Sequence, residues 1–281
     1  MAGEDSSRHL IKYPPPGVDA KAPNGARVYD AMLGGKDNFA ADRQVVESAL
    51  RVTPNVQAGA RANRAFLRRA VRYLVGEAGI TQILDIGSGL PAQGNVHEVA
   101  HEINPAVRTV YVDNDPVVYI HGQAMLADAR TTEVITADVR RPAEILDHPV
   151  LRRFIDFQQP VGLLLLAILH HISDDEDTSG VVAALRDAMP RGSYLVISSF
   201  RMPGPELAAQ RAEIAEMERL FNERLGSGYW RSAETIRGWF GDWQMLPPGL
   251  VPLPDWRPDE PGPVTQDVTY HGLAGGVARK N

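Results

Sequence analysis

The sequence predicts an α/β fold built on a doubly wound, mostly parallel sheet with a helical extension before it. Short β-type runs alternate with helical segments between residues 82 and 198, which is the pattern of βαβ units. The run 161–169 is almost wholly apolar, as expected for a central strand covered on both faces. Three successive runs end at Asp85, Asp113 and Asp138. These carboxylates should meet at the carboxyl edge of the sheet, where α/β proteins bind ligands.

The individual elements follow from periodicity and from start and stop signals. Strands are expected over 82–86, 108–112, 133–137, 161–169 and 193–198. Helices are expected over 95–103, 117–129, 143–157, 179–189 and 207–225, and Ser232 is expected to cap one more. Seven prolines predict an extended loop over 247–263. The β-like stretch 264–278 is expected to be a last strand that closes the sheet.

Two segments precede the sheet. Residues 1–26 contain four prolines and little periodicity, which predicts a flexible arm. Residues 27–281 are expected to form a single domain that begins with a helical portion over 27–78. Within that portion, 61–74 is predicted to be an amphipathic helix. Its arginines, Arg61, Arg64, Arg68 and Arg72, lie on one face and form either a solvated surface or an anion site.

Composition excludes several classes of function. The chain has 281 residues, no cysteine and a formal net charge of −6. The lack of cysteine excludes disulfides, thiolate zinc sites, iron–sulfur clusters and cysteine nucleophiles, and it fits a reducing compartment. The acidic balance disfavours a nucleic-acid partner. No apolar signal segment is visible, and the longest apolar run is too short to span a bilayer, so we expect a cytoplasmic location and no membrane partner.

The main chemical motif is Asp85-Ile86-Gly87-Ser88-Gly89, at the end of a predicted strand. Glycines in such a turn let a ligand approach the backbone and leave amide N–H groups free to bind it. A carboxylate ending the next strand, here Asp113, can accept two hydrogen bonds from a ribose diol. The loop is not the dinucleotide fingerprint, because Leu90-Pro91-Ala92 follows it, and no Walker phosphate loop is present.

Several segments resemble the motifs of class I S-adenosylmethionine-dependent methyltransferases. Residues 83–89 are similar to the first motif, 110–116 to the second and 136–139 to the third, and the strand ending in Leu169-His170-His171 is similar to the fourth. Residues 28–30 with 33–39, and 90–91 with 93–99, resemble one actinobacterial S-adenosyl methyltransferase family, long catalogued as a domain of unknown function. The resemblance covers about residues 25–280. It departs from the class at Pro91, where members often have a third glycine.

The resemblance implies a Rossmann-like fold with a seven-stranded sheet, S-adenosyl-L-methionine as the cofactor and methyl transfer as the activity. It places the amino-acid part of the cofactor at the glycine loop, the ribose at Asp113 and the adenine beside Asn114. Independently of the resemblance, we expect the helical portion 27–78 to form a lid over the cofactor through Tyr29 and Asn38. The expected cofactor-binding residues are Tyr29, Asn38, Asp85, Gly87, Ser88, Gly89, Asp113, Asn114, Asp138, Val139, Ala167 and His170.

His170 and His171 are the candidate catalytic residues, because a histidine at the carboxyl end of a strand can deprotonate a methyl acceptor. Alternatively, the protein binds the cofactor without catalysing transfer. A third hypothesis is a zinc hydrolase, since His97-Glu98-x-x-His101 matches the H-E-x-x-H motif. The third ligand of that motif is missing, so we expect no metal.

The methyl acceptor is not specified by any motif, and we expect a small molecule because the net charge disfavours nucleic acid. Four tryptophans lie in the C-terminal part of the chain, at Trp230, Trp239, Trp243 and Trp256. They either line an acceptor pocket or, as is more common for tryptophan, belong to the core.

Overall fold

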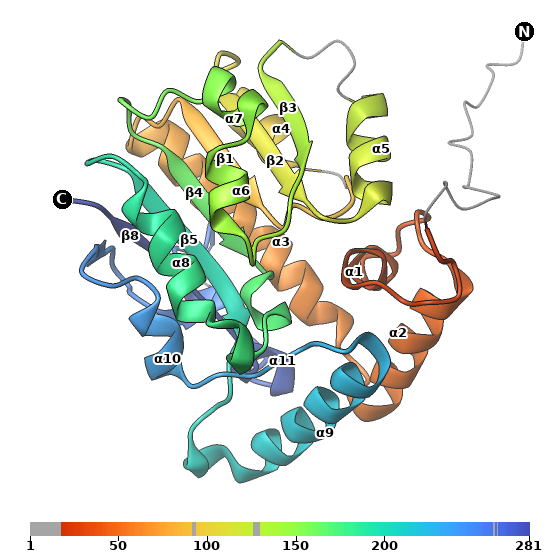
Figure 1. Ribbon diagram of the computed structural model, residues 1–281. Helices are drawn as coiled ribbons and strands as arrows, with labels where there is room; N and C mark the ends of the chain where they lie inside the picture. Colours follow the sequence, from red (N-terminus) through yellow and green to blue (C-terminus); the bar gives the residue numbers. More distant parts are fainter. Residues whose placement is uncertain (1–17, 92–93, 126–129, 261, 263) are drawn as a thin grey trace, which may run out of the picture.

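The structure is a computed structural model that describes residues 18–91, 94–125, 130–260, 262 and 264–281. Its centre is an eight-stranded sheet with helices on both faces (Figure 1). The strands are β1 (Gln82–Ile86), β2 (Arg108–Asp113), β3 (Thr132–Thr136), β4 (Gly162–Leu166), β5 (Tyr194–Phe200), β6 (Gln244–Met245), β7 (Val251–Pro252) and β8 (Leu273–Arg279). They follow the order β3-β2-β1-β4-β5-β8-β6, and β7 pairs with β8 outside this path.

The first five strands are parallel, whereas β8 is antiparallel to β5, β6 and β7. The predicted doubly wound, Rossmann-like fold with an N-terminal helical region is therefore confirmed. The main path has the seven strands that the resemblance implied, and the two-residue strand β7 is an addition to it.

The apolar run of β4 reflects its place in the middle of the sheet. Successive side chains of a strand point to opposite faces. Leu163 and Leu165 accordingly belong to the core cluster on one face, and Leu164 and Leu166 to the cluster on the other. Because both faces are covered, neither set can be polar.

The helices are α1 (Gly25–Met32), α2 (Ala40–Val52), α3 (Gln57–Arg72), α4 (Val96–His101), α5 (Pro116–Met125), α6 (Pro142–Leu146), α7 (Pro149–Phe154), α8 (Thr178–Asp187), α9 (Ala208–Leu225), α10 (Ala233–Gly238) and α11 (Val268–His271). Residues of α6, α7, α8 and α10 pack on one face of the sheet. Residues of α3 and α4 pack on the other face. This arrangement leaves α1, α2 and α9 beyond the end of the sheet (Figure 1).

These last three helices share a separate apolar cluster. Val28 and Met32 of α1 and Val45 of α2 pack with Met217 and Phe221 of α9. The N-terminal helices are thus joined to a helix that lies far away in sequence. Together they form a wall opposite the carboxyl ends of the strands.

Some elements differ from their prediction. The strand expected over 161–169 ends at Leu166, because Ala167 adopts a left-handed conformation with φ of 55° and Leu169–His171 form a short 3-10 turn. The strand expected over 264–278 begins only at Leu273. Asp267 starts helix α11 before it, since its carboxylate accepts hydrogen bonds from the N–H groups of Thr269 and Tyr270. Residues 143–157 form two short helices, α6 and α7, in place of one.

Of the arm expected over 1–26, residues 1–17 lie outside the described residues, as do 126–129 at the end of the helix expected over 117–129. The side chain of Asn24 caps α1 by accepting a hydrogen bond of 2.8 Å from the N–H of Ala26. Helix α1 therefore begins at Gly25, slightly before the boundary that the sequence suggests. No helix in the described ranges has the length and apolarity needed to cross a bilayer.

Candidate functional site

A cavity of about 690 Å³ lies at the carboxyl ends of β1, β2, β3 and β4. Its walls come from these strand ends on one side and from α1, α3 and α9 on the other. Small-molecule sites typically have volumes of about 300–1,000 Å³. The cavity also has the position expected in an open α/β sheet, where ligands bind outside the carboxyl ends of the strands.

The glycine loop after β1 forms one wall. The N–H groups of Gly87 and Ser88 donate to the carbonyl oxygen of Val112 at 2.8 and 3.2 Å, which ties the loop to the end of β2. Gly87 has a φ of 74°, and a Cβ there would lie 2.5 Å from the side chain of Ile168. At Gly89, with a φ of 67°, a Cβ would meet nothing within 4 Å. The loop therefore borders open space at Gly89, and the hydroxyl of the neighbouring Ser88 is buried without a hydrogen-bond partner among the described residues.

Two buried carboxyl groups flank this loop. Asp113 accepts hydrogen bonds from the N–H of Gly89 at 2.8 Å and from the N–H of Asp115 at 2.9 Å, so its orientation is fixed. Burial raises the pKa of Asp113 in spite of these donors. Burial also raises the pKa of Asp85 to about 7, against the opposing effect of the nearby Arg64 guanidinium. Asp85 therefore keeps its proton to a higher pH than an exposed aspartate does.

The end of β3 contributes an ion pair. Arg140 binds both carboxylate oxygens of Asp138, at 2.9 and 3.0 Å from its Nε, and a second nitrogen donates to Glu176 at 3.0 Å. These hydrogen bonds hold the pKa of Asp138 below its ordinary value. All three side chains line the cavity, and they connect the β3 end to the turn that follows β4.

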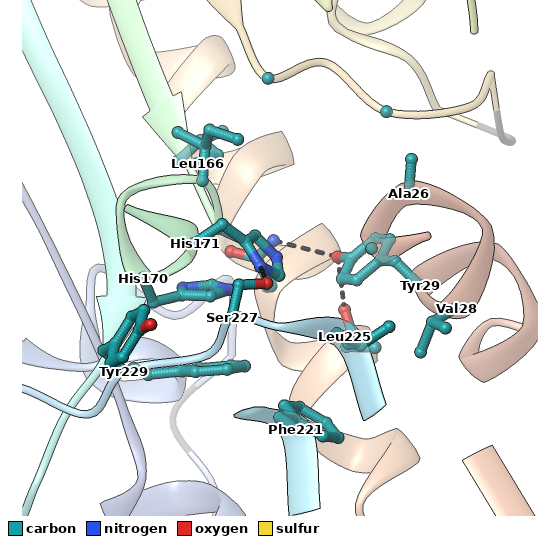
Figure 2. Close-up of a pocket in the computed structure, with 18 of the residues that line it drawn as sticks. Ala26, Val28, Tyr29, Leu166, His170, His171, Phe221, Leu225, Ser227 and Tyr229 are labelled. Atoms are coloured by element: carbon teal, nitrogen blue, oxygen red, sulfur yellow. Dashed lines mark hydrogen bonds between the residues drawn. The ribbon is translucent and has the colours of Figure 1, made fainter. Parts of the chain in front are cut away.

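A buried relay of hydrogen bonds crosses the cavity wall. The N–H of Ala167 donates to the hydroxyl of Ser198 at 3.0 Å, and that hydroxyl donates to the side-chain oxygen of Asn63 at 2.6 Å. The amide nitrogen of Asn63 then donates to the hydroxyl of Tyr29 at 3.0 Å, which donates to the carbonyl of Ala60 at 3.2 Å (Figure 2). These bonds link the end of β4 through α3 to α1.

The two candidate histidines lie in the turn after β4 and have different surroundings (Figure 2). The ring of His170 stacks on Phe200 with centroids 3.6 Å apart, and Phe200 stacks in turn on Trp230 at 4.0 Å. The Nδ1 atom of His171 lies 2.9 Å from the hydroxyl of Ser227. Burial lowers the pKa of His170 well below its ordinary value and that of His171 to about 4. Both rings are consequently neutral at physiological pH.

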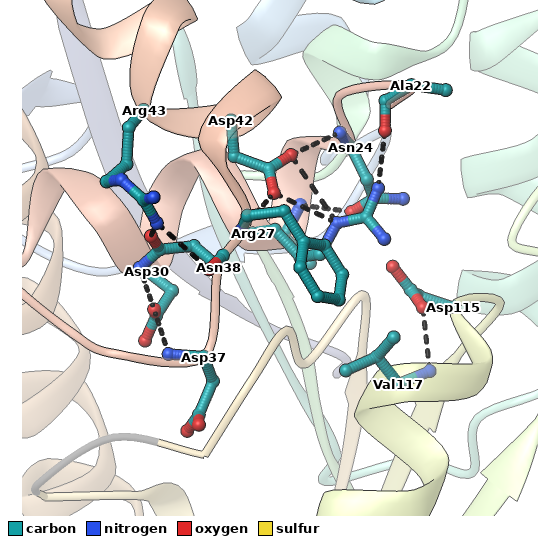
Figure 3. A network of polar contacts seen from close by, with 12 residues as sticks. Ala22, Asn24, Arg27, Asp30, Asp37, Asn38, Asp42, Arg43, Asp115 and Val117 are labelled. Atoms are coloured by element: carbon teal, nitrogen blue, oxygen red, sulfur yellow. Dashed lines mark hydrogen bonds and ion pairs between the residues drawn. The ribbon is translucent and has the colours of Figure 1, made fainter. Parts of the chain in front are cut away.

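The structure brings all but one of the predicted site residues to this cavity. Those that line it are Tyr29, Asp85, Gly87, Ser88, Gly89, Asp113, Asn114, Asp138, Val139, Ala167, His170 and His171. Asn38 does not line it. Its amide nitrogen donates to Asp30 at 2.8 Å and its oxygen accepts from Arg43 at 2.9 Å, so Asn38 holds the turn between α1 and α2 (Figure 3).

The H-E-x-x-H motif has a structural explanation. Glu98 accepts hydrogen bonds from the N–H groups of Gly94 and Asn95 and so caps α4. His97 contacts the hydroxyl of Tyr111 at 2.8 Å, and His101 contacts the carbonyl of Val107 at 2.9 Å. Within the described ranges no three histidine, cysteine or acidic side chains are grouped so that they could hold a metal ion. The zinc-hydrolase alternative is therefore not supported.

Sequence reasoning missed part of the site. Arg64 lines the cavity, whereas Arg72 on the same helix pairs with Glu102 at the surface. The basic face was visible in the sequence, but not which arginine turns inward. Trp230 lines the cavity, while the other three tryptophans are buried in the core. The lining residues of α9 carry no motif at all, because they only become neighbours of the strand ends in the folded chain.

A family model for S-adenosyl methyltransferases matches residues 12–281. The chain belongs to this S-adenosyl methyltransferase family. It is an S-adenosylmethionine-dependent methyltransferase, so the predicted class of enzyme and the predicted cofactor are confirmed. The glycine loop fits this cofactor, because it offers an unpartnered buried hydroxyl at Ser88 and open space at Gly89.

Two solved structures are similar to this chain over nearly its whole length. One is a proposed methyltransferase from Thermobifida fusca YX, with 46% identity, a TM-score of 0.90, and coverage of 96% of this chain and 99% of that one. The other is a DUF574 family protein from Streptomyces avermitilis MA-4680, with 37% identity, a TM-score of 0.87, and coverage of 94% and 99%. A methyltransferase from Anabaena variabilis, at 15% identity and a TM-score of 0.51, shares the fold. No curated protein matches the chain.

Proposed function

We propose that this methyltransferase transfers the methyl group to a small molecule that binds in the same cavity as the cofactor. The observation that carries the proposal is the continuity of the cavity. It runs from the glycine loop and Asp113 to the aromatic side chains of Phe200 and Trp230. A single concave cavity of this kind is typical of sites that bind small molecules.

The cofactor would occupy the strand-end side of the cavity. In this proposal Asp113 accepts hydrogen bonds from the ribose diol, and the glycine loop with Asp85 holds the amino-acid part. Asp138 and the amide of Val139 bind the adenine, beside Asn114. Arg64 is an addition to the predicted set, because it lines the same part of the cavity and its charge acts on Asp85. It would face the carboxylate of the bound cofactor.

The cofactor supplies an electrophilic methyl group, so the protein mainly has to align the acceptor and exclude water. The turn from Ala167 to His171 lines the cavity between the strand-end side and the aromatic side chains of Phe200 and Trp230. It is the place where we expect the methyl group to be transferred. His170 and His171 are neutral there, so each can accept or donate a hydrogen bond to the acceptor. Tyr29 closes the cavity from α1, which is the lid role we propose for the helical portion 27–78. We further propose a cytoplasmic location, which the absence of cysteine supports.

The proposal can be tested with a cofactor that carries a labelled methyl group. The protein is incubated with a cell extract separated into a small-molecule fraction and a macromolecular fraction. We expect label in the small-molecule fraction, and no label with the Asp113→Ala variant. Label that appears only in protein or RNA would contradict a small-molecule acceptor. Cofactor binding without label in either fraction would favour a non-catalytic binding protein.

A further inference from the structure

Charge is distributed unevenly over the cavity wall. The charged residues that line it in the described structure are Arg64, Asp85, Asp113, Asp138, Arg140 and Glu176. All six belong to the cofactor side, which we call the strand-edge lobe. Asp85 and Asp113 flank the glycine loop and interact with each other, and the charge of Arg64 acts on Asp85. The other three form the ion-pair group at the end of β3.

The opposite side, which we call the apolar lobe, is built from α1, α9, β5 and the start of β8. Its side chains are Met32, Phe200, Ile214, Met217, Phe221, Leu225, Trp230 and Leu273. The stacked rings of His170, Phe200 and Trp230 form one wall, and neighbouring rings lie within 15° of parallel. The polar groups that border this lobe are the neutral side chains of Tyr29, Thr53, Asn63, His170, His171, Ser227, Tyr229 and Thr269. The hydroxyls of Thr53 and Thr269 are engaged as donors to Glu213 and Asp267.

We propose that the methyl acceptor is an uncharged, largely apolar molecule that binds in the apolar lobe and presents one hydroxyl or amine group to the turn at His170 and His171. This inference rests on the proposed function and names the chemical class of its acceptor. It follows from the cost of burying a charge. A carboxylate or ammonium group in this lobe would lose its hydration, and the described side chains that line the lobe include no ion of opposite sign to pair with it.

The neutral polar side chains have little capacity left to replace such a partner. The hydroxyl of Tyr29 and the amide of Asn63 are engaged in the buried relay. Ser227 and the Nδ1 atom of His171 are bonded to each other. The ring of His170, the Nε2 atom of His171 and the hydroxyl of Tyr229 remain to bind a hydroxyl or amine group of the acceptor. The aliphatic and aromatic surface of α9 and β5 can cover an apolar skeleton.

Three nearly isosteric phenols separate the effect of charge from that of shape: neutral 4-hydroxyacetophenone, anionic 4-hydroxybenzoate and cationic 4-hydroxybenzylamine. Their binding to the full-length protein saturated with S-adenosylhomocysteine is measured by isothermal titration calorimetry. A fragment of this size binds with a Kd on the order of 1 mM when it fits. We expect the neutral compound to bind about tenfold or more tightly than either charged one.

A pair of variants on α9 places the binding site. Leu225→Lys puts a cation into the apolar lobe, at a half-buried position in the last turn of the helix. Leu220→Lys puts the same cation on the same helix but outside this cavity, where Leu220 lines a surface groove. Leu225→Lys should improve the binding of 4-hydroxybenzoate by about tenfold and weaken that of the neutral compound. Leu220→Lys should leave both affinities as they are in the wild type.

Several results would overturn the inference. They are equal affinity for a charged and the neutral phenol, no binding of any of the three, and an unchanged preference in Leu225→Lys that still binds S-adenosylhomocysteine. If a variant fails to fold, the wild-type comparison of the three phenols still decides the matter. If the wild-type protein does not bind S-adenosylhomocysteine, the result refutes the proposed cofactor site and not the inference about the acceptor.

Discussion

The buried relay predicts that Asn63 is important for stability although it lies on no motif. Asn63 is 4% exposed and bonds the hydroxyls of Tyr29 and Ser198. Asn63→Ala removes both bonds, which leaves the fully buried hydroxyl of Ser198 without its acceptor and the partly buried hydroxyl of Tyr29 without its donor. Each such group costs about 1–3 kcal/mol. The sum of the two is about 2–6 kcal/mol, and because 1 kcal/mol shifts the Tm of a domain of this size by about 2–4 °C, we expect a fall of about 4 °C or more.

A double-mutant cycle tests the relay itself. Ser198→Ala also breaks the bond between Ser198 and Asn63, so the two substitutions share one interaction. Their combined effect on the free energy of unfolding, measured by urea titration, should therefore differ from the sum of the single effects by about 0.5–3 kcal/mol. Ser48→Ala is a matched control, because the hydroxyl of Ser48 on α2 makes only solvent-exposed hydrogen bonds, and it should change stability by less than about 0.5 kcal/mol. Additive effects, or an Asn63→Ala protein as stable as the wild type, would refute this reasoning.

Three other predictions concern the site. Asp113→Asn should weaken S-adenosylhomocysteine binding by about 10- to 100-fold in calorimetry, since one charged hydrogen bond contributes about 1.5–3 kcal/mol. Asp147→Asn, at an exposed position, should leave this binding unchanged. The pKa of Asp85 is raised to about 7, and Asp85 must lose its proton to pair with the ammonium group of the cofactor. The affinity for S-adenosylhomocysteine in calorimetry should therefore fall by up to about tenfold per pH unit below 7. Asp85→Asn should remove this pH dependence. The folded-state pKa of His171 is lowered from 6.5 to about 4, so the stability that its neutral form contributes is present above pH 6.5 and is lost as the pH falls toward 4. Urea titrations across this range should show a smaller loss for His171→Gln, and an equal loss would contradict the assigned pKa.

The part of the site that follows the strands could be predicted because its signals are local. An apolar run followed by Asp85, Asp113 or Asp138 gives both the strand and the side chain at its end. The parallel order of the sheet then brings these ends together. Asn38 shows where local information stops. The segment between α1 and α2 was recognised, but the side chain that faces the cavity is decided by how α1 packs, and Asp30 holds Asn38 away from it.

The short helix α11 was missed for a related reason. Four residues are too few to show a helical period, and the only signal is Asp267, whose capping bonds compete with the β-like character of the residues around it. Similarly, nothing in the run 161–169 marks Ala167 as left-handed. That conformation is held by the hydrogen bonds of Ala167 to the backbone and side chain of Ser198, which belongs to another strand.

The two lobes of the cavity differ in how the chain builds them, and this difference bears on specificity. The strand-edge lobe is made by consecutive βαβ units, so a change in one of its residues also disturbs the sheet. The apolar lobe comes mostly from α1 and α9, whose residues Val28, Met32, Met217 and Phe221 belong to one apolar cluster with α2. Side chains on these two helices can change without altering the strand ends. In the proposed arrangement the choice of acceptor can therefore vary among relatives while the cofactor site stays the same, and substitutions in α9 should alter acceptor binding more than binding of S-adenosylhomocysteine.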